Sequence, residues 1–225
     1  MRLIKMFGLA AIAVGAFMAF LGATSASAVT SLEQVVLCKK LVDPCPVVDQ
    51  VPSGLIIHGT APLGVELLGP PDVYCLTSEV LGETTTGLAH GKITSMAFNH
   101  CLELPSTLCT AVTSKNLPWL IKAELKSNHT EYEALVTSGG TGDPSALLQC
   151  PNTADCTFGA ATVLGEILHG GASGLALLDI LQELPGKGLC FFTSGVWHAK
   201  YELKCLLPTG TSVGCWPSMH QNVVL

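Results

Sequence analysis

The chain has almost no arginine: its 225 residues contain a single one, Arg2. Asp and Glu together outnumber Lys and Arg by 17 to 11. The planar guanidinium fork is the side chain that best matches phosphate groups and base edges. A net negative chain is also a poor partner for an anionic lipid surface. We therefore expect no nucleic-acid partner.

Motifs of common catalytic and cofactor sites are also missing. The sequence has no Gly-x-Ser-x-Gly elbow, no His-Glu-x-x-His pair, no phosphate-binding loop and no dinucleotide fingerprint. Residues 171–175 come nearest to the elbow, but Leu175 stands at its last glycine position. The sequence indicates no catalytic residue, cofactor or metal ligand, which favours a protein that is not an enzyme.

Residues 1–28 have the three parts of a secretory signal peptide. Arg2 and Lys5 provide the positive start, Met6–Gly22 is an uncharged apolar run, and residues 26–28 form an Ala-Ser-Ala cleavage site. The run approaches the ~20 residues that span a bilayer, but the small-residue site favours removal. We expect an exported chain without stable membrane insertion, located outside the cell or in the cell envelope. Cleavage changes its formal net charge from −6 to −8.

All cysteines lie after this leader, where an oxidising compartment lets thiols pair. Their number is even, and their spacings are wider than the Cys-x₂₋₄-Cys pairs of zinc sites. We therefore predict structural disulfides rather than a metal site. The candidate residues are Cys38, Cys45, Cys75, Cys101, Cys109, Cys150, Cys156, Cys190, Cys205 and Cys215.

Two segments share an ordered series of short motifs, which predicts an internal duplication. The matched pairs are VLGE at 80–83 and 163–166, HG at 90–91 and 169–170, ELP at 103–105 and 183–185, LC at 108–109 and 189–190, TS at 113–114 and 193–194, and a Trp-to-Lys stretch at 119–126 and 197–204. Equivalent cysteines would then form equivalent bonds, which predicts Cys75–Cys109 and Cys156–Cys190.

The duplication suggests a domain plan. We expect an N-terminal segment at 29–74, a first β unit at 75–137, a flexible loop at 138–149 and a second β unit at 150–225. The loop assignment rests on the Gly-rich stretch at 138–145. The two units either pack together as one domain or form two.

The segments 119–126 and 197–205 alternate apolar and polar residues, as half-buried antiparallel strands do. Their Trp residues, Trp119 and Trp197, are expected in the core. Further strands are predicted at 55–60, 65–68, 73–76, 92–98, 108–113, 132–137, 158–164, 189–192 and 222–225. Residues 30–40 read as a short helix, and 175–183 fit either a helix or a strand. The fold class is all-β, a disulfide-stapled antiparallel sandwich or barrel-like fold.

The leader, the Cys-rich β pattern and the strings GKITSMAF at 91–98 and NLPW at 116–119 resemble uncharacterised secreted proteins of high-GC Gram-positive bacteria. The resemblance covers residues 75–125 and implies export and a bacterial source. It carries no activity to any residue.

Two functions remain open. The first is a non-enzymatic binding or structural protein with an unknown extracellular or cell-wall ligand. The second is a secreted hydrolase with a dispersed site. A deep pocket with a histidine and a carboxylate in hydrogen-bond reach would favour the hydrolase. A face with exposed Trp or Tyr would favour binding.

Overall fold

The structure is a computed structural model that describes residues 34–69, 72–85, 88–105, 107–152, 155–168, 175–190 and 193–220. The signal peptide predicted at 1–28 and the strand predicted at 222–225 lie outside these residues.

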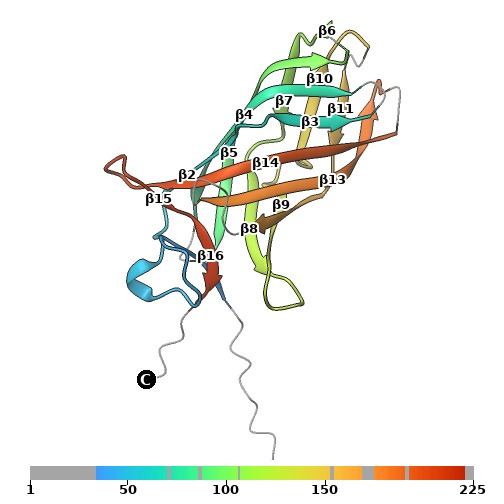
Figure 1. The fold of residues 1–225 in the computed structure, drawn as a ribbon. Coiled ribbons are helices and arrows are strands. Elements are labelled where there is room, and N and C mark those ends of the chain that lie inside the picture. Colours follow the sequence, from blue (N-terminus) through green and yellow to red (C-terminus); the bar gives the residue numbers. More distant parts are fainter. Residues whose placement is uncertain are drawn as a thin grey trace, which may run out of the picture. The chain divides into compact units, whose positions relative to one another are not determined.

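The described chain is built almost wholly of strands (Figure 1). A 3₁₀ turn, η1, covers Val47–Asp49. The strands are β1 Val35–Cys38, β2 Ile56–Ala61, β3 Val65–Leu68, β4 Val73–Thr84, β5 His90–Glu103, β6 Thr107–Leu108, β7 Ala111–Lys115, β8 Trp119–Leu125, β9 Tyr132–Ser138, β10 Ser145–Gln149, β11 Cys156–Gly159, β12 Thr162–Leu168, β13 Ala176–Gly188, β14 Ser194–Leu206, β15 Ser212–Gly214 and β16 Trp216–Met219.

Eight strands close into an antiparallel barrel, which confirms the predicted all-β, barrel-like class. Their order around the ring is β2, β4, β5, β8, β9, β12, β13 and β14, and β14 pairs back with β2. The ring strands occur in the same order in the chain, with the outer strands inserted between some of them. Closure removes the unpaired edges that an open sheet would expose.

Outer strands extend this ring along its four long members, β4, β5, β13 and β14. Strand β3 pairs with both β4 and β14. On the other side, β7, β10 and β11 connect β5 to β13 through successive antiparallel pairs. Gly64, between β2 and β3, has φ +83°, and a Cβ there would lie 2.6 Å from the Cys75 carbonyl oxygen. Only glycine fits that bend.

The period-two pattern sets which side chains face inward. In β14, Trp197, Ala199 and Tyr201 are buried, while the residues between them are half exposed. The partner strand β13 buries Ala176, Leu178 and Ile180 in the same way. A slip of one residue would move either set to the outer face, so burial specifies the register.

A two-stranded ribbon of β1 and β16 lies beside the barrel and is not part of the ring. The Ala89 amide donates to the Val35 carbonyl oxygen at 2.8 Å, which connects the ribbon to the chain entering β5. Figure 1 shows β16 near the end of the barrel where β8 and β9 meet. The helix predicted at 30–40 is wrong over the described part, because the apolar residues of β1 pair with β16 instead.

All ten cysteines form disulfides: Cys38–Cys45, Cys75–Cys101, Cys109–Cys150, Cys156–Cys190 and Cys205–Cys215. The predicted Cys156–Cys190 bond is confirmed. The predicted Cys75–Cys109 bond is wrong, because Cys75 and Cys101 are direct cross-strand partners on β4 and β5 with Cα atoms 3.9 Å apart. Cys109 bonds instead to Cys150.

Several predicted elements differ from the structure. The loop predicted at 138–149 is wrong at its C-terminal half, because 145–149 is strand β10, paired on both sides. The strand alternative for 175–183 is correct, since these residues belong mostly to β13. The strands predicted at 108–113 and 158–164 are each divided into two by a turn. At 189–192, the described residues Leu189 and Cys190 are not in a strand.

Candidate functional site

The barrel encloses an apolar cavity of about 80 Å³. Small side chains leave this space: Gly82, Gly91, Ala89, Ala123 and Ala134 all line it. Larger apolar residues from the facing strands, among them Val163, Ile167, Leu178 and Ile180, complete the wall. Almost none of the cavity surface is polar. Barrels of eight strands either fill with side chains or hold one small ligand, and this one retains room.

The ribbon contributes to the same cavity. Leu37 of β1 and Pro217 of β16 belong to its wall. Asp43, in the loop after β1, accepts a hydrogen bond from the Tyr132 hydroxyl of β9 at 2.7 Å. Asp43 also accepts from the Ser218 hydroxyl at 3.1 Å and the Met219 amide at 3.0 Å. One carboxylate in the loop after β1 thus joins barrel strand β9 to β16 of the ribbon.

Polar groups inside the barrel are few and mostly paired. The Tyr201 hydroxyl lies 3.0 Å from Ser78 Oγ, which itself donates to the Ala97 carbonyl oxygen at 2.8 Å. Burial raises the pKa of Tyr201 far above its ordinary value, and the bond to Ser78 opposes this only in part. Tyr201 is therefore a neutral wall residue and not an acid or base at physiological pH.

A second cavity of about 30 Å³ lies on the other side of Trp197. Phe98, Leu148, Phe158 and Leu184 contribute to its wall. Trp197 lines both cavities, and its ring lies against that of Phe98 with the centroids 6.2 Å apart.

The predicted core tryptophans are in the core. Trp119 and Trp197 are 2% and 5% exposed, and Trp216 is also buried. These tryptophans therefore do not form the exposed aromatic face that is expected of a surface-binding protein. Binding, if it uses them, takes place inside the barrel.

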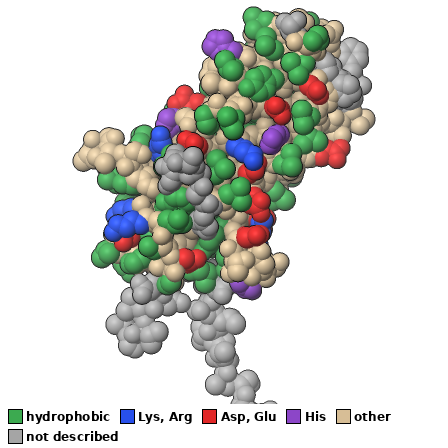
Figure 2. All heavy atoms as spheres, viewed as in Figure 1, with side chains coloured by type: hydrophobic (Ala, Val, Ile, Leu, Met, Phe, Trp, Pro, Cys, Tyr) green, Lys and Arg blue, Asp and Glu red, His purple; other side chains and the backbone are tan. Residues whose placement is uncertain are grey.

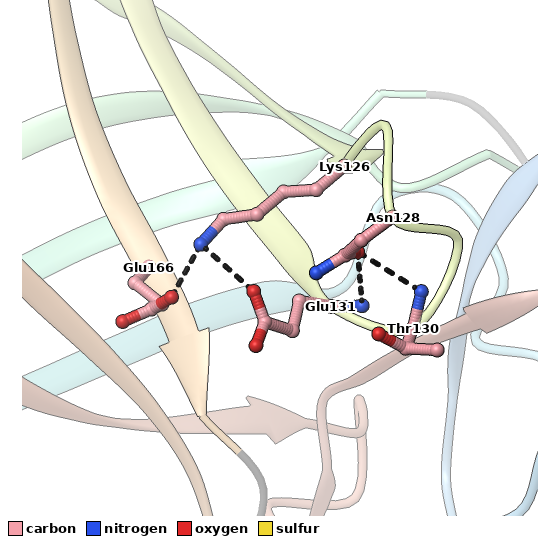
Figure 3. Close-up of polar contacts among 5 residues, drawn as sticks. All are labelled: Lys126, Asn128, Thr130, Glu131 and Glu166. Carbon is pink, nitrogen blue, oxygen red and sulfur yellow. Dashed lines mark hydrogen bonds and ion pairs between the residues drawn. The ribbon is translucent and has the colours of Figure 1, made fainter.

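The outer face of the barrel is charged and carries scattered leucines (Figure 2). Lys126, at the end of β8, forms ion pairs with Glu131 and with Glu166 of β12 (Figure 3). The bond to Glu166 is the main reason that the pKa of Lys126 is raised. Bonds to Asn128 and Lys126 lower the pKa of Glu131. In the turn at 128–130, Asn128 Oδ1 accepts from the Thr130 and Glu131 amides.

Four carboxylates line up across adjacent strands on this face. The register places Glu124, Glu133, Glu166 and Asp179 opposite one another in turn, and Lys200 of β14 follows Asp179. Like charges directly opposite repel. Lysines offset the repulsion, since Lys122 pairs with Glu124, Lys126 with Glu166 and Lys200 with Asp179. Three of the four carboxylates are therefore paired with a lysine, and Glu133 has no ion pair among the described residues.

Two histidines contact carboxylates, and both pairs lie on the outer face. His58 Nε2 is 2.6 Å from Glu79 Oε1, and His198 Nδ1 is 3.4 Å from Glu66 Oε2. Among the described residues, neither imidazole has a hydrogen bond to a Ser or Thr hydroxyl. Neither pair therefore has the nucleophile–base geometry of a hydrolase. The motif-like residues His169 and Ser173 lie outside the described residues.

The disulfide candidates are structural residues rather than a site. Every cysteine has a cysteine partner, so none supplies a thiolate to a metal. The barrel cavity has no signature in the sequence. Its small lining residues come from different strands, and no spacing in the sequence brings them together.

In the part of the chain that the structure describes, we find no helix with the length and apolarity of a bilayer-spanning segment. Five disulfides are typical of proteins that fold in an oxidising compartment. Comparison of the chain with protein-family models, with curated proteins and with solved structures gives no match.

Proposed function

We infer that this protein is a non-enzymatic binding protein of the extracellular space or cell envelope, and that it holds a small apolar molecule inside its barrel. The observation that carries the proposal is the cavity of about 80 Å³ with an almost wholly apolar wall. Ligand sites are typically concave and apolar. An apolar cavity of about 150 Å³ in another protein binds benzene or xenon. The cavity here is smaller, so it suits ligands no larger than these.

Export is part of the same proposal. The predicted leader, the placement of every cysteine after it and the five disulfides all support an extracellular or cell-envelope location. Each of these cross-links restricts the unfolded chain and so stabilises the folded barrel that surrounds the cavity.

We also propose that the barrel arose by duplication of one meander. Three of the matched motifs lie on ring strands in both copies: VLGE on β4 and on β12, ELP at the end of β5 and on β13, and the Trp-to-Lys stretch on β8 and on β14. In each set the middle strand pairs with both others, so the order of pairing is the same. Two copies related in this way would each contribute three of the eight strands of the ring.

Xenon and benzene test the binding function directly, with methyl resonances of the cavity wall as the readout. We expect both probes to shift the methyl signals of Val163, Leu178 and Ile180. Ala134→Leu fills the cavity from within and should abolish the shifts. Ala97→Leu adds the same atoms at an exposed position of β5 and should leave them unchanged.

Overpacking costs roughly 1–3 kcal/mol, so Ala123→Leu provides a second filled variant if Ala134→Leu does not fold. Absence of probe-induced shifts in the native protein would overturn the proposal. Shifts that persist in a folded cavity-filled variant would also overturn it, because the probes would then be bound elsewhere.

A further inference from the structure

Strands β12 and β13 share the shortest ladder in the ring. Among the described residues, three residue pairs join them, and Glu166–Asp179 is the last, whereas every other neighbouring pair of ring strands shares at least four. On this side of β13 the next main-chain partner is β11, which begins to pair at Gly186. The intervening residues of β13 pair only with β14 among the described strands. We call this interruption, between 162–165 and 180–185, the β12–β13 seam.

Gln182 closes the seam with its side chain. Its Oε1 accepts a hydrogen bond from the Leu164 amide at 2.7 Å, and its Nε2 donates to the Thr162 carbonyl oxygen at 3.2 Å. A side-chain amide thus takes the place of main-chain partners between the two strands. Gln182 is half-buried and does not line the barrel cavity. A rotamer change of one side chain is much faster than the separation of paired strands, so the seam can open without unfolding of the barrel.

The β12–β13 seam lies between two spaces. On the outer face, a groove of about 360 Å³ is lined by Leu164, Gly165 and Leu181, together with charged residues. On the inner face, Val163 and Ile180, their neighbours in the chain, line the barrel cavity. Gly165 adds no side chain to the wall, and a Cβ there would lie 2.5 Å from the nearest inner side chain. One layer of strands therefore separates the groove from the cavity.

The ribbon of β1 and β16 is the alternative route, since Leu37 and Pro217 belong to the cavity wall. Moving the ribbon would break the bond from Tyr132 to Asp43 and would uncover Val36, which is fully buried. Exposure of a buried aliphatic side chain is costly. Opening of the seam breaks only the two bonds of a half-buried glutamine, so we expect it to be the easier route.

We propose, on the basis of the proposed function, that apolar ligands enter and leave the barrel cavity through the β12–β13 seam, with Gln182 as its gate. The outer groove is the mouth of this route. Leu164 and Leu181 are 44% and 68% exposed there, and they offer apolar surface to a ligand that arrives from water. Charged molecules do not pass, because the apolar cavity wall has no group to compensate their desolvation.

The exchange of benzene between water and the cavity tests the route. Its rates are measured from the line shapes and relaxation dispersion of the Val163 and Ile180 methyl signals during titration. Gln182→Ala removes both bonds of the gate. We expect entry and release to become faster by about five- to thirtyfold, the factor that one to two hydrogen bonds represent. The dissociation constant should stay unchanged, because Gln182 does not line the cavity.

Gln149→Ala is the matched control, since Gln149 is a half-buried glutamine of β10, outside the ring, with one bond of 3.5 Å to Asp155. Its rates should equal those of the wild type. Tyr132→Phe tests the alternative route by loosening the ribbon. Unchanged rates in Gln182→Ala, or faster exchange in Tyr132→Phe alone, would overturn the inference and leave the proposed function intact. Failure of benzene and xenon to bind the wild type would instead overturn the proposed function.

Hydrogen exchange of the wild-type protein provides a test that needs no variant. The Leu164 amide is bonded to the gate, whereas the Ala134 residue of β9 lies between two main-chain ladders. We expect the Leu164 amide to exchange faster than the Ala134 amide, because rotation of Gln182 frees it without strand separation. Equal protection of the two amides would overturn the gate even if Gln182→Ala does not fold.

Discussion

The Tyr132 hydroxyl donates a hydrogen bond to Asp43 Oδ2 at 2.7 Å, across 89 positions of the sequence. Tyr132 is a buried residue of barrel strand β9, whereas Asp43 lies in the loop that follows β1. The same carboxylate binds Ser218 and Met219 through its other oxygen. This one side chain therefore connects the barrel, the β1 loop and β16.

We expect Asp43→Ala to destabilise the protein by roughly 2–4 kcal/mol, because three donors lose a charged acceptor together. Tyr132→Phe removes one of these bonds and should cost about 1 kcal/mol. Tyr74→Phe is the control, since the exposed Tyr74 hydroxyl makes a bond of 3.2 Å to the Leu63 carbonyl oxygen. Urea unfolding with the disulfides intact measures all three. A loss in Tyr74→Phe as large as in Asp43→Ala would contradict the role given to Asp43.

The disulfides should contribute to stability according to the length of chain that each closes. Cys109–Cys150 spans 41 positions and Cys205–Cys215 spans 10. In the chain-entropy model, removing them by paired Cys→Ala substitution costs about 4 and about 3 kcal/mol. Peptide mapping without reduction should recover both links and Cys75–Cys101. A fragment joining Cys75 to Cys109 would contradict the strand register.

Tyr201 should make the protein less stable in alkali. Its folded-state pKa is raised above the ordinary value of 10.0 by burial, so the unfolded chain loses its proton first. The stability is fully present below pH 10 and falls as pH rises towards the folded-state pKa, by about 1.4 kcal/mol per pH unit. Unfolding measured from pH 8 to 12 (about the range where the group titrates) should show this decline. Tyr201→Phe should flatten it, whereas Tyr74→Phe should not.

Lys126 follows β8 and should stabilise, through charge alone, the packing of β8 and β12 on either side of β9. Its pKa is raised by Glu166, so its contribution is lost as pH rises above the ordinary value of 10.5. The lowered pKa of Glu131 means that its contribution is lost as pH falls below the ordinary 4.5. We expect Lys126→Met to destabilise the protein between these limits, less so at high salt.

Lys115→Met is the matched control for Lys126→Met, because it removes an equal charge that has no ion pair among the described residues. Thermal unfolding at two salt concentrations measures the difference. An effect of Lys126→Met that does not change with salt would indicate lost packing of the lysine stem instead.

The sequence pattern predicted some strands of the fold and missed others. The alternation in 197–205 predicted β14 and the burial of Trp197, because a half-buried strand imposes its period on the residues themselves. The strand β4 was predicted only at 73–76, since its remainder does not follow the expected pattern: Ser78 and Thr84 are buried, whereas Leu81 is exposed. The apolar residues before Cys38 read as a helix, and their pairing with β16 depends on a segment at the opposite end of the chain.

The sequence by itself determined the class of the protein: alternation, turn residues and an even set of cysteines specify a disulfide-linked β fold, because these are local properties of the chain. The tertiary structure decided which cysteines pair and where the cavity lies. Cys101 meets Cys75 only because β4 and β5 adopt one register. Likewise Gly82, Ala123 and Ala134 leave a space only because barrel closure brings β4, β8 and β9 around a common interior.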